Sequence, residues 1–501
     1  MLRDIANGVA RNTTILMVQQ AITMSSSLLL LMFMPRALGP VEYGRFYLAY
    51  SIAGMFQILV SFGANYQITK NVAREREQTS QIFVDAMALR SVLAVLSMAA
   101  IVFLGRLLNY PHEQVVVLDI FSLTLIVWAG INTLYACYQG HELLGYTSLG
   151  AIGERVFMSV VTLAVLAFGA QAKEISAVVI GSGLVNLVLL AFRARVIIPS
   201  LPRIRWDNVL RQVRQGVPYF LLSVFGVIYY RIDGVMLSKM SPEAVLGWYG
   251  GAHRLFESLN IPYQLSIAVY PVLARYWKDG TNVHLQTLQR SLELVVVIAL
   301  PLTVGSMCFA DRIIGMFYGL NAFGETVILF QILCAGLVFL FVDMILATTL
   351  IASDKQRQSM IISLAAIPLN IGINWFLIPY FQRTAGDGAI GATTATGITE
   401  IFVMAALLSI LPAGLLKGLR WMVMLKGAAA AAAMAGAIAV LPQGIPWMLR
   451  LAMSTVVFAA AFWLSRPLPA GEDRFLREFF RTSLRSIGGR FRRPAPDPPV
   501  S

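Results

Sequence analysis

The chain is poor in charged residues and rich in hydrophobic ones. Only 13% of its 501 residues are Asp, Glu, Lys or Arg, and 57% are hydrophobic. Because soluble globular proteins carry about 25% charged residues, this composition excludes a soluble domain and predicts an integral membrane protein. The hydrophobic runs are continuous over about 20 residues instead of alternating over about 10, which favours transmembrane helices over a membrane barrel.

Cysteine is also scarce. Cys137, Cys308 and Cys334 all fall in hydrophobic runs, and the sequence has neither a CxxC pair nor a Cys/His cluster. We therefore expect them to be small core residues, and we predict no metal site and no cofactor. The polar start of the chain, residues 1–12, lacks a signal-peptide cleavage pattern, so the first hydrophobic run is expected to remain in the mature protein.

About fourteen hydrophobic runs are long enough to cross a hydrocarbon core of roughly 30 Å as helices. The expected spans are 13–34, 46–66, 82–108, 114–138, 149–170, 175–193, 217–238, 248–272, 288–309, 325–350, 358–380, 389–411, 421–441 and 446–464. The sequence thus predicts an all-α polytopic membrane protein.

Lys and Arg are distributed unevenly between alternate loops. With the N-terminus in the cytoplasm, 27 of the 39 Lys and Arg residues lie on the cytoplasmic side and 8 on the outer side. Cytoplasmic loops are enriched in these residues, so we predict that both termini are cytoplasmic. The net charge of +13 then lies mostly at the anionic inner leaflet and requires no nucleic-acid partner.

The chain repeats a pattern at a period near 200 residues. LGPVEYGRFYLAYSI (38–52) after the first span matches MSPEAVLGWYGGAHRL (240–255) after the seventh, since both place Pro and then Gly-aromatic before the next span. Six spans per half give a parallel repeat, which suits a substrate site between two lobes. The predicted units are an N-lobe (1–193), a cytoplasmic linker (194–216), a C-lobe (217–412), two further spans (413–464) and a basic, partly disordered cytoplasmic tail (465–501).

Arg231 and Asp233 lie inside the seventh span. A charge near the middle of a transmembrane helix costs at least about 2.5–3.5 kcal/mol. Two residues apart on a helix, these side chains do not share a face and cannot simply neutralise each other. Each is expected to find water, a partner on another helix or a ligand. Structural pairing with neighbouring helices is the alternative to a role in binding.

Other ionisable residues lie within the predicted spans. They are Asp85, Arg90, Glu154, Arg155, His253, Arg254, Glu257, Glu293, Asp343 and Glu400. Such residues usually face a bundle interior or a watery cavity. Arginine can hold phosphate or carboxylate through two parallel hydrogen bonds, and a buried carboxyl can take up and release a proton. For Asp85, Glu154, Arg155 and Glu293, which lie near cytoplasmic span ends, an interfacial position is the simpler interpretation.

Three segments resemble a known family. LGPVEYGRFYLAYSI, YQGHELLGYTSLG and YYRIDGVMLSKMSPEAVLGWYGGAHRLFESL are similar to the polysaccharide-export (Wzx-type oligosaccharide flippase) branch of the multidrug/oligosaccharidyl-lipid/polysaccharide flippase superfamily. The resemblance covers roughly residues 10–412. It implies a V-shaped alternating-access transporter in the bacterial cytoplasmic (inner) membrane, with two six-helix lobes, two extra C-terminal helices and a cationic central cavity.

The resemblance also implies a substrate and a set of site residues. The substrate would be an undecaprenyl-diphosphate-linked oligosaccharide, flipped for surface polysaccharide (O-antigen, capsule or exopolysaccharide) biosynthesis. The partners implied are membrane lipids and the polymerase and glycosyltransferases of the same pathway. The cavity arginines of the family correspond here to Arg90, Arg231, Arg254 and Arg155. The candidates for coupling to a proton or sodium ion are Asp233, Glu257, Asp343 and Glu400.

Three other functions are alternatives to this one. A multidrug/cation antiporter of the same superfamily would bind cations, which the intramembrane arginines disfavour. A lipid II flippase is closer in chemistry and stays open. A membrane glycosyltransferase or polymerase would need a sizeable outer loop, whereas the longest one here spans only about 15 residues from Phe309 to Glu325, so we predict that the protein is not an enzyme.

Overall fold

The computed structural model describes residues 2–259, 266, 269–270, 272–275, 277, 282–411 and 414–465, and these residues form helices without any strand. The predicted tail lies outside the described residues from 466 onward. The first helices are α1 (Leu2–Ser61), α2 (Asn65–Arg74), α3 (Thr79–Leu107), α4 (His112–Ser122), α5 (Thr124–Gly140), α6 (Leu144–Ala167), α7 (Ala172–Ala194) and α8 (Trp206–Met240). The remainder are α9 (Glu243–Ser258), α11 (Asn282–Cys308), α12 (Ala310–Phe317), α13 (Leu320–Phe323), α14 (Thr326–Ala335), α15 (Leu337–Ala352), α16 (Gln356–Thr384), α17 (Gly388–Ile410), α18 (Gly414–Gly418), α19 (Trp421–Val440) and α20 (Trp447–Leu464).

The helices confirm the all-α transmembrane fold class. Among the described residues, ten helices are long and apolar enough to cross a membrane, or eleven when α14 and α15, bent by 44°, count as one span. Helix α1 contains the first predicted span, 13–34, and most of the second, 46–66. The two spans are separated by a break in α1 at Gly39, where φ is 70°. Glycine adopts this left-handed backbone without strain. The helix resumes at Pro40, and we call residues 40–61 the second arm of α1.

The seventh predicted span does not begin a separate helix. Helix α8 already starts at Trp206, within the segment predicted as a linker, and continues to Met240. The preceding residues 195–205 pass along α3, where the buried Asp85 carboxylate accepts hydrogen bonds from the Arg205 backbone N–H (2.8 Å) and from Asn208 Nδ2 (2.9 Å). Asp85 therefore fixes the start of α8 to the first turns of α3, which begins at Thr79.

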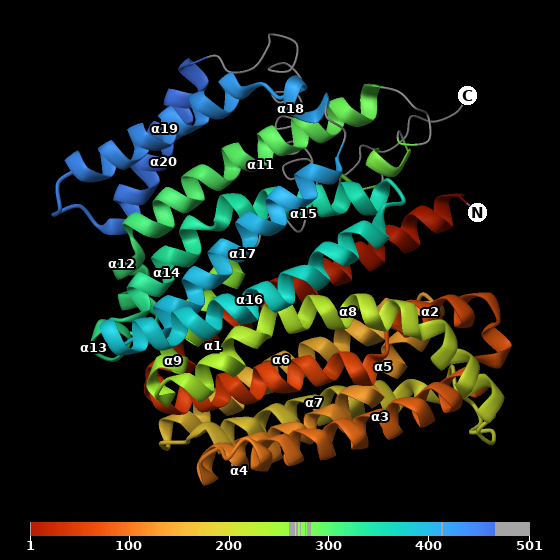
Figure 1. The fold of residues 1–501 in the computed structure, drawn as a ribbon. Helices are drawn as coiled ribbons and strands as arrows, with labels where there is room; N and C mark the ends of the chain where they lie inside the picture. The colour runs from red at the N-terminus through yellow and green to blue at the C-terminus, as the bar shows by residue number, and fades with distance from the viewer. Residues whose placement is uncertain are drawn as a thin grey trace, which may run out of the picture.

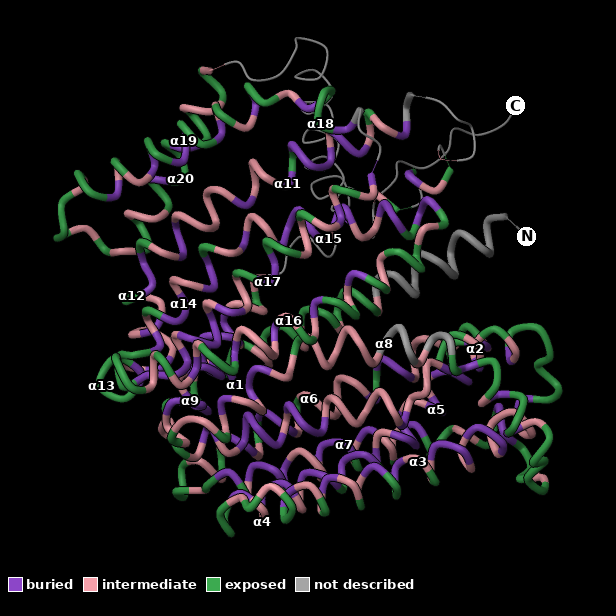
Figure 2. Tube along the Cα trace, viewed as in Figure 1, coloured by how far each residue is buried: buried purple, intermediate pink, exposed green. Residues whose placement is uncertain are grey.

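The helices form two diverging groups (Figure 1). We call α1–α7 the N-lobe and α8–α17 the C-lobe; α8 lies between them and packs against both α16 and α1. Helices α19 and α20 pack against each other, and α19 packs on the outside of α11. The lobes meet near α9, α12 and α13, which we call the closed end, and diverge toward the end where the N-terminus lies, which we call the open end. Figure 2 shows buried residues inside both lobes and many exposed ones on α19 and α20, as expected for helices that face lipid.

Backbone contact holds the closed end together. A Cβ atom added to Gly44 would meet the Glu243 carbonyl oxygen at 2.5 Å, and one added to Gly247 would overlap the Pro40 carbonyl. Glycine at both positions lets the second arm of α1 and α9 approach more closely than larger residues allow. Beside this contact, Arg45 forms an ion pair with Glu243 at 2.9 Å. The two lobes therefore touch most closely at the end opposite the N-terminus.

Candidate functional site

A cavity lies between the two lobes near the middle of their helices. It encloses about 970 Å³, including the part open to solvent. Its polar and aromatic lining residues include Ser27, Tyr43, Tyr47, Tyr50, Trp128, Glu154, Arg155, Ser182, Arg231, Arg254 and Glu257. Tyr50, Arg231 and Arg254 each lie roughly ten residues from the closed end of their helix, or about 15 Å along it. That distance is half of a hydrocarbon core, so this central cavity lies near the bilayer midplane.

Two arginines form the C-lobe wall of the central cavity around one aromatic ring. The guanidinium carbons of Arg231 and Arg254 lie 5.1 and 5.4 Å from the centre of the Tyr50 ring. Glu257 pairs with both, at 3.6 Å from Arg231 and 3.2 Å from Arg254. One carboxylate shared by two arginines leaves an excess positive charge. In addition, Arg231 Nη1 is buried without a hydrogen-bond partner among the described residues.

The N-lobe wall adds a third arginine. Arg155 lines the same cavity from α6, and its guanidinium makes no hydrogen bond or ion pair within the described part of the chain. Its neighbour Glu154 also faces the cavity. The interfacial interpretation of these two residues is therefore replaced by a cavity position: α6 ends at Ala167, so both lie about 18–20 Å from its closed end.

A second cavity of about 1320 Å³ lies inside the C-lobe. Asp233 faces it and accepts hydrogen bonds from Thr396 Oγ1 (2.6 Å) and Asn374 Nδ2 (3.4 Å). Glu400 faces it as well and accepts from Tyr229 at 2.8 Å. We call this the C-lobe cavity. Its lining carboxylates come from α8 (Asp233), α9 (Glu257) and α17 (Glu400), and α17 lies far from the other two in the sequence.

Asp343 contributes a further carboxyl group to this region. Its side chain is 6% exposed and lies near enough to Glu400 for the two carboxyl groups to interact electrostatically, but it is not among the residues that line the cavity. Neither of its oxygens has a hydrogen-bond donor among the described residues. Two neighbouring carboxylates repel each other unless a proton or cation lies between them. The arrangement can therefore take up a cation or a proton.

Arg231 and Asp233 have separate partners, as their spacing requires. Arg231 forms an ion pair with Glu257 and lies over the Tyr50 ring. Asp233 accepts hydrogen bonds from Thr396 and Asn374. Arg231 and Glu257 line both cavities. One short segment of α8 thus connects the central cavity with the C-lobe cavity.

Arg90 is placed apart from the other predicted site residues. It is 1% exposed inside the N-lobe and donates to Asn65 Oδ1 (2.5 Å) and Thr133 Oγ1 (3.1 Å). It lines neither of the two cavities. These contacts join α3 to α2 and α5, which is a structural role.

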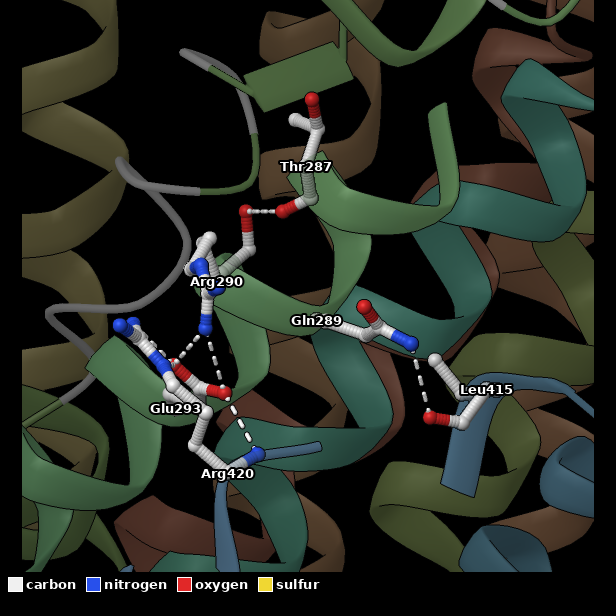
Figure 3. Close-up of polar contacts among 7 residues, drawn as sticks. Thr287, Gln289, Arg290, Glu293, Leu415 and Arg420 are labelled. Carbon is white, nitrogen blue, oxygen red and sulfur yellow. Dashed lines mark hydrogen bonds and ion pairs between the residues drawn. The ribbon is translucent and has the colours of Figure 1, made fainter. Parts of the chain in front are cut away.

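Glu293 also lies away from both cavities. It accepts hydrogen bonds from the backbone N–H and the guanidinium of Arg420 and from Arg290, with distances of 2.6–3.0 Å (Figure 3). Nearby, Gln289 donates to the Leu415 carbonyl at 3.0 Å. These contacts fix the segment before α19 to α11, so Glu293 attaches the last two helices to the C-lobe.

Several site residues were not predicted from the sequence because they are uncharged. Tyr50, Thr396, Asn370 and Asn374 carry no charge that would mark them in a hydrophobic run. The four-residue spacing of Asn370 and Asn374 was an available signal, since it places both amides on one helix face. The contact of Asn374 with Asp233 depends on the packing of α16 against α8, which the sequence does not reveal.

Comparisons with known proteins agree with this architecture. The family model described as "Polysaccharide biosynthesis protein" matches residues 9–277, more than half of the chain, and the MatE model matches residues 218–376. A probable low-salt glycan biosynthesis flippase, Agl15 of Haloferax volcanii, is 20% identical over 372 residues, covering 73% of this chain and 76% of that protein. The probable lipid II flippase MurJ of Buchnera aphidicola is 28% identical over 218 residues, covering 41% and 42%. The solved structure of lipid II flippase MurJ in an inward closed conformation superposes with a TM-score of 0.72 at 14% identity, covering 94% of this chain and all of that one.

Proposed function

The chain belongs to the polysaccharide biosynthesis protein family and is a flippase of the multidrug/oligosaccharidyl-lipid/polysaccharide superfamily; from this premise we propose that it moves polyprenyl-diphosphate-linked oligosaccharides across the membrane. The proposal rests on one observation. Arg155, Arg231 and Arg254 converge on the central cavity at the depth of the bilayer midplane. No hydrophobic substrate needs three arginines there, and each is expensive to place in lipid.

The chemistry of such a substrate explains the arginines. A diphosphate that crosses hydrocarbon loses its hydration, and arginine replaces it with charge-assisted, paired hydrogen bonds. Arg231 has an unused buried nitrogen and Arg155 an unused guanidinium within the described residues, so both can bind without first breaking an internal contact. The sugars would lie in the cavity while the polyprenyl chain remains in lipid.

The orientation follows from the charge distribution. With both termini in the cytoplasm, the open end faces the cytoplasm and the closed end the periplasm of a bacterial inner membrane. The substrate, which is assembled on the cytoplasmic leaflet, would enter from the open end. Release requires the contact between the second arm of α1 and α9 to separate.

The C-lobe cavity is the proposed coupling site. Asp233, Asp343 and Glu400 would take up a proton or a sodium ion there. Because Asp233 lies two residues after Arg231 on α8, its neutralisation would relax a helix that also forms the substrate wall. Glu257, which pairs with Arg231 and Arg254, would compete with the diphosphate for these two guanidinium groups once the substrate is bound.

Reconstitution into liposomes tests the proposal. The probe is a fluorescent undecaprenyl-diphosphate disaccharide, and the readout is the rate at which it becomes accessible to a quencher outside. A hydrogen bond to a charged group contributes about 1.5–3 kcal/mol, so Arg231→Gln and Arg254→Gln should each slow flipping roughly 10- to 150-fold. Arg312→Gln, an exposed residue of α12 paired with Asp311, is the matched control. Wild-type flipping rates in folded Arg231→Gln and Arg254→Gln proteins would contradict the proposal.

A lipid II flippase is the second candidate, favoured by the TM-score of 0.72 to the MurJ structure. Both substrates present a diphosphate, so the arginines do not separate them. The same liposome assay does so when the disaccharide probe is compared with one that carries a pentapeptide. Faster flipping of the probe without the peptide supports the polysaccharide substrate, and the reverse supports lipid II.

A further inference from the structure

The N-lobe wall of the central cavity contains an acid that a diphosphate site does not need. Glu154 faces the cavity beside Arg155, yet the two side chains form no ion pair with each other in the described part of the chain. A carboxylate only accepts hydrogen bonds, and it repels phosphate. The Glu154 carboxylate is therefore suited to a part of a substrate that donates hydrogen bonds.

Glu154 is held in place by a buried network. Asn186 Nδ2 donates to Glu154 Oε2 at 2.6 Å and to the Tyr135 hydroxyl at 2.9 Å. Asn186 is 1% exposed and lies against Gly150, where an added Cβ would overlap the amide oxygen of Asn186. The other carboxylate oxygen, Oε1, accepts no hydrogen bond from the described residues. One oxygen is thus fixed and the other is available to a ligand.

An aromatic ring and a hydroxyl line the same wall. Trp128 of α5 and Ser182 of α7 face the cavity together with Glu154 of α6. The Trp128 indole N–H has no acceptor in the described part of the chain. The Ser182 hydroxyl donates to the Val179 carbonyl at 2.8 Å and so can still accept a hydrogen bond. An indole ring with a free N–H beside a carboxylate and a hydroxyl acceptor matches a sugar ring, whose C–H groups pack on aromatics and whose hydroxyl and amide groups donate and accept hydrogen bonds.

We propose that Glu154, Trp128 and Ser182 form a saccharide subsite that binds the first sugar next to the diphosphate. This inference rests on the proposed function. The position of that sugar follows from the chain itself, because Glu154 directly precedes Arg155, which is assigned to the diphosphate. Asn186 is a positioning residue: it aims the carboxylate and does not contact the sugar. The central cavity is therefore divided, with the diphosphate on the arginines and the sugar on the N-lobe wall.

Glu154→Gln is the sharpest variant. Asn186 would continue to donate to the side-chain oxygen of the glutamine at position 154. The NH2 group of that glutamine would then occupy the position of Glu154 Oε1. An acceptor would thereby become a donor without change of shape. A site built to bond a sugar hydroxyl or amide discriminates strongly when that bond is lost. Trp128→Leu removes the ring face, Trp128→Phe keeps one, and Asn186→Leu frees the carboxylate. The matched control is Glu113→Gln, an exposed acid of α4.

The experiment measures the Kd of the full-length protein in detergent for two sets of probes. The first set is farnesyl diphosphate alone. The second set is farnesyl diphosphate linked to glucose, galactose, N-acetylglucosamine or N-acetylgalactosamine. In the wild type at least one sugar should tighten binding about tenfold. Glu154→Gln, Trp128→Leu and Asn186→Leu should abolish this increment, measured as the ratio of the Kd for farnesyl diphosphate to the Kd for the sugar probe. Farnesyl diphosphate alone should bind Glu154→Gln at least as tightly as the wild type, because a carboxylate that repels phosphate is removed. Trp128→Phe should retain most of the increment.

The outcomes separate the two proposals. If the wild type binds no probe, the proposed function fails. If every sugar probe binds like farnesyl diphosphate alone, the subsite is refuted while the diphosphate site stands. If Glu154→Gln weakens all probes by one common factor, Glu154 supports the cavity as a whole and the subsite is refuted. The subsite is also refuted if the sugar still tightens binding to the Glu154→Gln protein as much as to the wild type.

Discussion

Gly247→Ala should open the closed end. A Cβ at this position overlaps the Pro40 carbonyl oxygen and lies 2.6 Å from its carbon, so it meets backbone that cannot rotate away. Restoring ordinary contact requires α9 and the second arm of α1 to separate by roughly 1–2 Å. Overpacking of this kind costs about 1–3 kcal/mol. If the strain exists only while the end is closed, the equilibrium shifts about 5- to 150-fold toward the state open at this end.

Spin labels at Lys173 and Arg312 can measure this shift. Both side chains are more than half exposed, and both lie near the break in α1. Glu42, next to the break, accepts from the α7 backbone at Ala172, and Arg36 donates to the carbonyl of Gly315 in α12. In a background without the three native cysteines, pulsed electron paramagnetic resonance should show a longer distance gaining population in Gly247→Ala.

The control is Gly54→Ala, on the same second arm of α1, where an added Cβ meets no atom within 4 Å. It should leave the distance distribution unchanged. Gly247→Ala should also slow flipping, since the transporter would rest in the wrong state. A Gly247→Ala distribution identical to that of the wild type would show that the glycine contact does not hold the lobes together.

Other predictions address residues outside the central cavity. Glu293→Gln should lower the free energy of unfolding in detergent by about 1–3 kcal/mol, because the partly buried Arg420 guanidinium loses its charged acceptor; unchanged melting would contradict the attachment role. Arg90→Met should lower stability by a similar amount, about 1–3 kcal/mol, without weakening diphosphate binding in the folded fraction; a selective binding loss would return Arg90 to the substrate site. Asp233→Asn should remove the dependence of flipping on the proton or sodium gradient, and a preserved dependence would exclude this residue from coupling. Burial raises the pKa of Asp387, at the start of α17, to about 6, so its contribution to stability is present below about pH 4 and lost as the pH rises through 6; Asp387→Asn should lack this loss in melting curves from pH 4 to 8.

The agreement between predicted spans and helices has a simple cause. The hydrocarbon core imposes a length of about 20 apolar residues and forces every backbone group into an internal hydrogen bond. A local hydrophobic run therefore suffices to predict a helix. Where the run was interrupted by polar residues, as before Val217, the helix boundary was missed: the amphipathic segment from Trp206 continues into α8 without a break.

The site was only partly predictable. Charges within the spans are costly, so Arg231, Arg254, Asp233, Asp343 and Glu400 were recognisable from the sequence. The cost alone does not say what stabilises each charge. Arg90 and Arg231 look alike in sequence, yet one is bound to Asn65 and Thr133 inside the N-lobe and the other faces the central cavity.

The sequence by itself determined the class of protein, the transmembrane helices and the residues whose charge must be stabilised, because these depend on local composition and on the thickness of a bilayer. Only the tertiary structure decided which charges share a cavity. Tyr50 meets Arg254 across some 200 residues of chain, and Glu154 meets Asn186 because α6 packs against α7. Such meetings depend on the rotation and register of packed helices, which the hydrophobic pattern of a single helix does not fix.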